Sequence, residues 1–172
     1  MIDLIAPFKA FIKPWEEVKK LKGSLVDGLI YNEIGAVILA VITFLFGNLL
    51  PSTPKMLAGV MSFALLILVP IGLLITSGIY YALAKLFGGK GSFDKQTFLL
   101  GAVSLPLTIF TIIPIINILA ALWSLVVYFF VLKEAHQLSD LKTIVVELLP
   151  AVVIGIIATL AVMLMLPSIP TV

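Results

Sequence analysis

Residues 97–132 read TFLLGAVSLPLTIFTIIPIINILAALWSLVVYFFVL, an apolar stretch that decides how often the chain can cross a membrane. One helix needs roughly 20 residues to cross a bilayer core of about 30 Å, so this stretch is too long for one span and just long enough for two. Its PIIN segment, residues 114–117, has the composition of a tight turn. We predict two short spans, 97–114 and 115–132, that form a hairpin. A re-entrant hairpin, which enters the membrane and returns to the same side, fits the same sequence.

The composition of the whole chain indicates a membrane protein. Of its 172 residues, 62% are hydrophobic and only 12% are charged, whereas about 25% of residues are charged in soluble domains. Three further apolar stretches, residues 34–50, 56–87 and 143–166, are predicted spans. The predicted fold class is therefore all-α: a polytopic integral membrane protein with five transmembrane helices. The chain has no cysteine, which excludes disulfides, thiolate metal sites and cysteine nucleophiles.

Residues 1–28 carry too many charges to cross the membrane, but their apolar side chains are ordered. Pro14 divides the segment into two short helices, and Trp15 is the predicted interfacial anchor. We predict a cytoplasmic, interfacial region at 1–28 and a membrane domain at 29–172. The apolar residues recur at spacings of three and four with lysines between them, which is typical of amphipathic helices in the headgroup plane. This apolar stripe consists of Ile5, Phe8, Phe11, Ile12, Trp15, Val18 and Leu21.

All eleven basic residues are lysine, and their positions predict the orientation of the chain. With five spans and a cytoplasmic N-terminus, every lysine except Lys55 falls on the cytoplasmic side, as the positive-inside rule requires. Four full spans would remove this asymmetry, whereas a re-entrant hairpin at 97–132 would preserve it. The formal net charge of +2 reflects this bias and does not indicate a nucleic-acid partner.

The charged turn VLKEAHQLSDLKT, residues 131–143, holds the first group of candidate functional residues. Lys133, Glu134, His136 and Asp140 lie between the last two predicted spans and form a candidate docking turn for a partner. His136 is the only histidine, and Cys/His clusters of the usual spacing are missing, so no metal site is predicted. The alternative is structural: one helix ends at Lys133, and the next is capped by Asp140 or the serine before it.

Polar residues near the apolar interior are candidates for a solute path. A carboxylate inside a span costs free energy and usually faces the bundle or water, so Glu33 and Glu147 are candidate functional residues. Asn117 and the prolines of the spans would suit a discontinuous-helix site of the transporter kind. The alternatives are that both glutamates reach the headgroups and that the prolines only kink their helices.

The glycine-rich segment GGKGS, residues 88–92, resembles a phosphate loop only superficially. It lacks the upstream glycine of the G-x-x-x-x-G-K-[ST] pattern, and Gly91 occupies the place of the hydroxyl residue. We predict that residues 88–96, GGKGSFDKQ, form a turn between helices, with Ser92 as the N-cap of the next helix.

Small residues in the last span predict close helix packing. Ala151, Gly155 and Thr159 recur at spacings of four and therefore share one face of the helix. In lipid, close approach across small residues favours helix association. The face is predicted to pack within the chain or between two copies of it.

Several stretches in order resemble the Yip-domain family, the Ypt/Rab-interacting proteins and their short prokaryotic relatives. They are PFKAFIKPWEEVKK, GGKGSFDKQTF, AVSLPLT and PIINILAALWSLVVYFFVLKEAHQLSDLKT. The resemblance implies a five-span fold with a cytoplasmic N-terminus, in the plasma membrane of a prokaryote. For eukaryotic members it also implies Rab GTPase binding in vesicle traffic. That partner is not expected here, because the segment before the first span is short and lacks an Asp-Leu-Tyr-Gly-Pro type sequence.

The predicted function is that of a non-enzymatic membrane protein. No predicted span carries an ordered set of base, nucleophile and metal ligands, so no enzyme is expected and no cofactor is predicted. The expected partners are the lipid bilayer and either a second copy of the chain or other membrane proteins, in a role such as membrane organisation or a trafficking-type scaffold. The alternative is a small-solute, ion or lipid transporter or channel.

Overall fold

The computed structural model describes residues 3–49 and 55–165, and every regular element of these residues is a helix. The all-α prediction is therefore confirmed. The last residues of the predicted spans 34–50 and 143–166, at positions 50 and 166, lie outside the described residues. The elements are α1 (Ile5–Ile12), α2 (Pro14–Glu17), the 3-10 helix η1 (Val18–Lys20), α3 (Leu25–Leu49), α4 (Lys55–Leu86), α5 (Phe93–Thr111), α6 (Pro114–His136) and α7 (Asp140–Met165).

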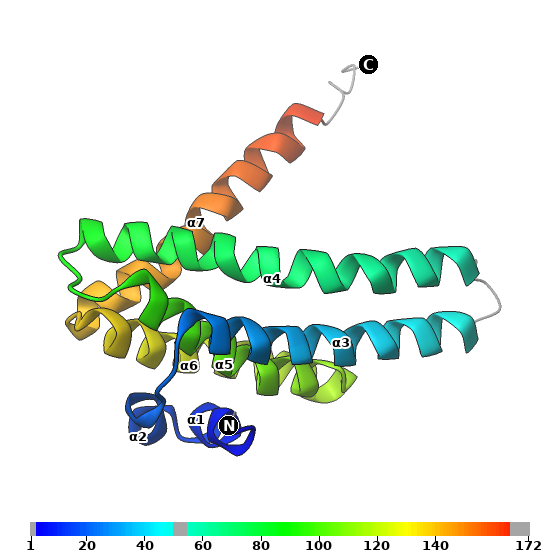
Figure 1. Cartoon of the computed structure of the whole chain (residues 1–172). Helices are drawn as coiled ribbons and strands as arrows, with labels where there is room; N and C mark the ends of the chain where they lie inside the picture. Colours follow the sequence, from blue (N-terminus) through cyan, green and yellow to red (C-terminus); the bar gives the residue numbers. More distant parts are fainter. Residues whose placement is uncertain (1–2, 50–54, 166–172) are drawn as a thin grey trace, which may run out of the picture.

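The long helices form two hairpins and one diverging helix. Figure 1 shows α3 and α4 as a long antiparallel pair, with the shorter α5 and α6 pair beside α3 and with α7 leading away from the bundle. Helix α5 is the centre of the packing, because ten of its residues are buried. It runs parallel to α3 and contacts it along much of its length.

Two glycines allow α3 and α5 to touch backbone to backbone. A Cβ added at Gly101 would lie 2.2 Å from the carbonyl oxygen of Gly28, and one added at Gly28 would lie 2.5 Å from the Cα of Phe98. Real Cβ atoms do not approach other atoms so closely. Small residues at a helix crossing are the usual means of close packing in membranes, and here they bring together the first and third long helices.

The N-terminal helices pack on the α5 and α6 hairpin. The indole nitrogen of Trp123 donates to the Phe11 carbonyl at 2.6 Å, and the rings of Phe11 and Phe110 stack with centroids 5.4 Å apart. Of the predicted stripe, Phe11 and Val18 are buried, and Phe8 and Leu21 pack against the core. Ile5 and Ile12 remain exposed on the outer side, where they can meet lipid.

The prediction of five membrane spans is wrong by the length and composition of the helices. Four helices of the described residues are long and apolar enough to cross a membrane: α3, α4, α6 and α7. Helix α5 does not qualify, because Asp94, Lys95 and Gln96 in its first turn lower the hydropathy of its 19 residues. The predicted span began at residue 97 and so left out these polar residues, but the helix starts at Phe93, within the predicted turn.

The two hairpins differ in length. Gly28 lies opposite Gly101 and Gly35 lies opposite Thr108, so the end of α5 is level with about residue 38 of α3. Helix α3 continues to Leu49, which is about 16 Å further at a rise of 1.5 Å per residue. The closed end of the α5 and α6 hairpin therefore stops well short of the far end of α3.

Candidate functional site

A buried polar chain joins α4, α5 and α6 where the hairpins open, and we call Ser77, Gln96 and His136 the polar junction. His136 is fully buried, and its Nε2 lies 2.5 Å from the side-chain oxygen of Gln96. Gln96 is also fully buried, and its amide nitrogen donates to the Ser77 carbonyl at 2.7 Å. The three residues link segments that are far apart in the sequence.

The bond to Ser77 determines the hydrogen positions of the polar junction. Because the amide nitrogen of Gln96 donates to a carbonyl, its oxygen is left to accept from His136. The histidine therefore carries its hydrogen on Nε2, and Nδ1 is an acceptor. Nδ1 is buried without a partner among the described residues, and a Cβ added at Gly91 would lie 2.9 Å from it.

The GGKGS loop closes over this end of α6. The backbone nitrogen of Lys90 donates to the His136 carbonyl at 3.0 Å. A Cβ at Gly91 would lie 1.9 Å from the Ala135 carbonyl oxygen, so only glycine fits there. The loop thus serves as a close-fitting turn, and Gln137 ends α6 in the left-handed conformation at φ 55°.

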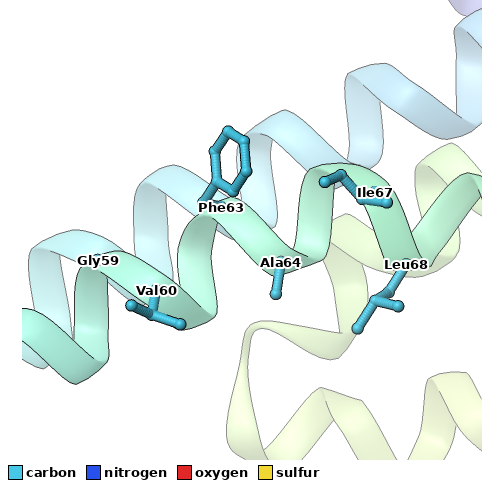
Figure 2. A pocket seen from close by; sticks show the side chains of 6 residues that line it. All are labelled: Gly59, Val60, Phe63, Ala64, Ile67 and Leu68. Carbon is cyan, nitrogen blue, oxygen red and sulfur yellow. The ribbon is translucent and has the colours of Figure 1, made fainter.

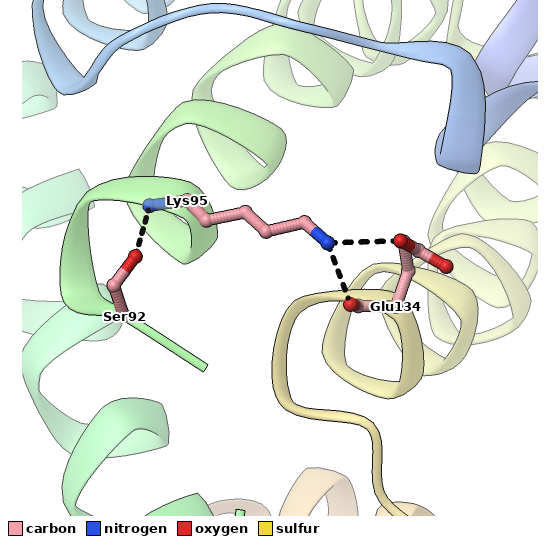
Figure 3. Close-up of polar contacts among 3 residues, drawn as sticks. All are labelled: Ser92, Lys95 and Glu134. Atoms are coloured by element: carbon pink, nitrogen blue, oxygen red, sulfur yellow. Dashed lines mark hydrogen bonds and ion pairs between the residues drawn. The ribbon is translucent and has the colours of Figure 1, made fainter. Parts of the chain in front are cut away.

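Ion pairs surround the polar junction at the surface. Figure 3 shows Lys95 reaching Glu134, where its ammonium donates to the carboxylate at 2.8 Å and to the backbone carbonyl at 3.0 Å. The hydroxyl of Ser92 accepts from the Lys95 backbone nitrogen at 3.2 Å, which confirms the predicted cap. Lys133 pairs with Asp140. The four predicted residues of the turn therefore lie together, but each is engaged in contacts within the chain.

The predicted intramembrane polar residues lie apart from one another. Glu147 is buried on α7, and its Oε1 has no partner among the described residues. Glu33 is half-buried on α3, and Asn117 is exposed near the start of α6. The buried amide in this part of the fold is Asn32, which donates to the Ser104 hydroxyl at 2.9 Å.

The prolines do not interrupt their helices. Pro70, Pro106 and Pro150 lie inside α4, α5 and α7, each of which continues past its proline. Near Pro106, the hydroxyls of Ser104 and Thr108 donate to carbonyls one turn earlier in α5, at 2.7 and 2.9 Å. Within the described residues, the discontinuous-helix arrangement is therefore not seen at these three prolines.

The outer surfaces of α4 and α7 are apolar and open. Every residue from Ala151 to Leu160 is exposed, and no atom lies within 4 Å of a Cβ added at Gly155. The small face of Ala151, Gly155 and Thr159 is therefore exposed, and Gly155 at its centre meets open space. A shallow groove on α4, shown in Figure 2, is lined by Gly59, Val60, Phe63, Ala64, Ile67 and Leu68.

Replacing Gln96 with leucine is expected to destabilise the protein by about 1–3 kcal/mol, because it leaves the Nε2 hydrogen of His136 and the Ser77 carbonyl buried without partners. Lys95→Gln is the matched control, since it removes an exposed ion pair that is worth about 1 kcal/mol or less. Thermal unfolding in detergent measures both. Equal melting of Gln96→Leu and the wild type would show that the polar junction does not hold the helices together.

Comparison with known proteins assigns the family. A search of curated proteins and a search of solved structures each found no match. The family model for the Yip1 domain matches residues 5–163, which includes the N-terminal helices, both hairpins and nearly all of α7. The chain therefore belongs to the Yip1 domain family.

Proposed function

We propose that this protein is a non-enzymatic membrane scaffold that acts by packing against a second copy of itself or against partner membrane proteins. The observation that carries the proposal is α7. It leaves the bundle, and each of its residues 151–160 is exposed, although they include a face of small residues. A helix that only had to cross lipid would not need such a face, whereas a helix that packs on another helix does.

We place the membrane from the positions of the hairpin ends. Helix α5 begins and α6 ends side by side, as the contacts of Lys95 with Glu134 and of Lys90 with His136 indicate. The two helices must therefore cross the membrane together or not at all. Since α5 does not qualify as a span, we propose that α5 and α6 form the re-entrant hairpin and that α3, α4 and α7 cross. This arrangement keeps every lysine except Lys55 on the side of the N-terminus, which we assign to the cytoplasm.

Replacing Gly155 with leucine is expected to weaken self-association by about tenfold or more, because the added side chain holds two backbones apart at a cost of about 1–3 kcal/mol. The melting of the single chain should not change, since Gly155 contacts no other described element. Ile156→Leu is the matched control on a neighbouring face. Cross-linking in native-like bilayers over a range of protein-to-lipid ratios measures the oligomer. An unchanged oligomer in Gly155→Leu would assign this face to lipid or to a different partner protein.

A transporter is the second candidate function, and buried Glu147 is the observation that favours it. Its carboxyl is buried on α7 with one oxygen that has no partner among the described residues. The uptake of small solutes and ions into proteoliposomes would be compared between the wild type and Glu147→Gln. An uptake that changes in Glu147→Gln would support the transporter, whereas an equal permeability of the two would leave Glu147 as a packing residue.

A further inference from the structure

A polar pocket of about 390 Å³ lies between the N-terminal helices and the beginning of α3. Its position is informative, because α3 is a candidate membrane span that begins at Leu25. The side chains around the pocket come from both sides of that starting point: Asp3, Lys20, Lys22, Asp27 and Tyr31, with Phe98 of α5. The pocket therefore lies where a span meets the headgroup layer of the membrane.

The pocket carries both signs of charge, and the structure shows which groups are already engaged. Lys20 hydrogen-bonds Glu17 at 2.5 Å, and this bond lowers the pKa of the Glu17 carboxyl. Lys22 takes part in none of the ion pairs of the described residues. Of the cations that line the pocket, Lys22 is therefore the one free to bind an anionic group.

The two carboxylates of the pocket each use one oxygen to cap a helix. Oδ1 of Asp3 accepts from the backbone nitrogens of Ile5 and Ala6, at 2.9 and 3.2 Å. Oδ2 of Asp27 accepts from Ser24, at 2.7 Å from its backbone nitrogen and 2.8 Å from its hydroxyl. These bonds fix both carboxylates in place, and each retains a second oxygen with no partner among the described residues.

Aromatic rings complete the pocket. Tyr31 is buried, and its hydroxyl donates to the Asp3 carbonyl at 2.9 Å, which ties the start of α1 to α3. Phe98 is buried beside it and would contact a Cβ at Gly23. Carboxylates together with aromatic faces favour an ammonium group, whereas a free lysine favours a phosphate.

We propose that this pocket binds the headgroup of a zwitterionic aminophospholipid, with the phosphate on Lys22 and the ammonium between Asp27 and Asp3. An anionic headgroup would place its negative charge beside two fixed carboxylates. A phosphate ester with an ammonium group uses both signs of charge, and the place of the pocket at the start of a span favours a lipid over a soluble molecule. The proposal does not depend on self-association of the protein.

The test uses the full-length protein in nanodiscs that contain equal amounts of phosphatidylethanolamine and phosphatidylglycerol, with native mass spectrometry to count the lipids retained after release. The wild type is expected to retain one phosphatidylethanolamine. Lys22→Gln and Asp27→Asn should each lower that occupancy about tenfold, since each removes a charge-assisted hydrogen bond to the headgroup. The side-chain oxygen of asparagine can still accept the hydrogen bonds from Ser24, so the fold should be kept. Lys9→Gln, on the exposed side of α1, is the matched control.

Three outcomes would overturn the proposal. Retention that is equal in the wild type and both variants would show that the lipid binds elsewhere. Preference for phosphatidylglycerol that increases in Asp27→Asn would assign the pocket to an anionic lipid. Displacement of the retained lipid by millimolar phosphoethanolamine, with no phosphatidylethanolamine requirement for occupancy, would assign it to a soluble ligand.

Discussion

Replacing Gly101 with alanine is expected to disrupt the packing of the membrane helices, although it adds a single methyl group. The new Cβ would lie 2.2 Å from the Gly28 carbonyl oxygen and 2.8 Å from the Gly28 Cα. Both obstacles are backbone atoms, so no side chain can move aside, and the helices must separate. Overpacking costs about 1–3 kcal/mol and sometimes more, and we expect the upper end of this range because α5 is the most buried helix. The melting temperature, measured by tryptophan fluorescence during thermal unfolding, should fall by roughly 6–12 °C.

Gly72→Ala in α4 is the matched control for that experiment. No atom lies within 4 Å of a Cβ added at Gly72. The same change there should be neutral or should stabilise the helix by about 0.4–1 kcal/mol, because alanine has less conformational freedom to lose. If Gly101→Ala and Gly72→Ala melted alike, the close crossing of α3 and α5 would not exist in the membrane.

Cysteine labelling is expected to show whether the α5 and α6 hairpin crosses the membrane completely or returns to the side from which it entered. The chain suits the method because it has no cysteine of its own. Lys90→Cys and Gln137→Cys should react with a membrane-impermeant maleimide from one side. Met56→Cys, which is exposed at the start of α4, should react only from the other side. Asn117→Cys, at the closed end of the hairpin, should react with a permeant reagent and with the impermeant reagent from neither side.

The labelling of Asn117→Cys separates the two topologies. Reaction with the impermeant reagent from the Met56 side would mean that α5 and α6 cross completely. Reaction of Lys90→Cys and Gln137→Cys from opposite sides would contradict both arrangements, since the structure places these residues at the same end of the bundle.

The helices were predictable because their signals are local. Apolar runs of sufficient length and a serine before a first turn depend on neighbours in the sequence, and they located every long helix to within a few residues except at the start of α3. The PIIN segment was predicted as a turn, which is wrong, because Pro114 begins α6. That helix begins at Leu25 rather than near residue 34, because Asp27, Asn32 and Glu33 interrupt the apolar run without ending the helix.

The polar junction and the glycine crossing were not predictable, because they depend on pairs distant in the sequence. Gln96 looked like the last residue of a surface turn, and only its contact with His136, forty residues later, makes it a core residue. Gly28 and Gly101 stand 73 positions apart, and nothing in the sequence near either glycine indicates that the two helices meet there. The regular pattern on α7 was easier to find, yet its central Gly155 contacts nothing within the described part of the chain.

The unequal hairpins give the protein a wedge-shaped profile. At the level of Gly35 the four helices of both hairpins lie side by side, whereas beyond about residue 38 only α3 and α4 of these four continue. The N-terminal helices add to the wider end. In the proposed membrane arrangement, the protein therefore displaces more lipid area from one leaflet than from the other. A flat bilayer must stretch or compress its leaflets to accommodate this difference, but a bilayer that bulges toward the N-terminal helices accommodates it without strain, so the protein should concentrate on membranes with that curvature.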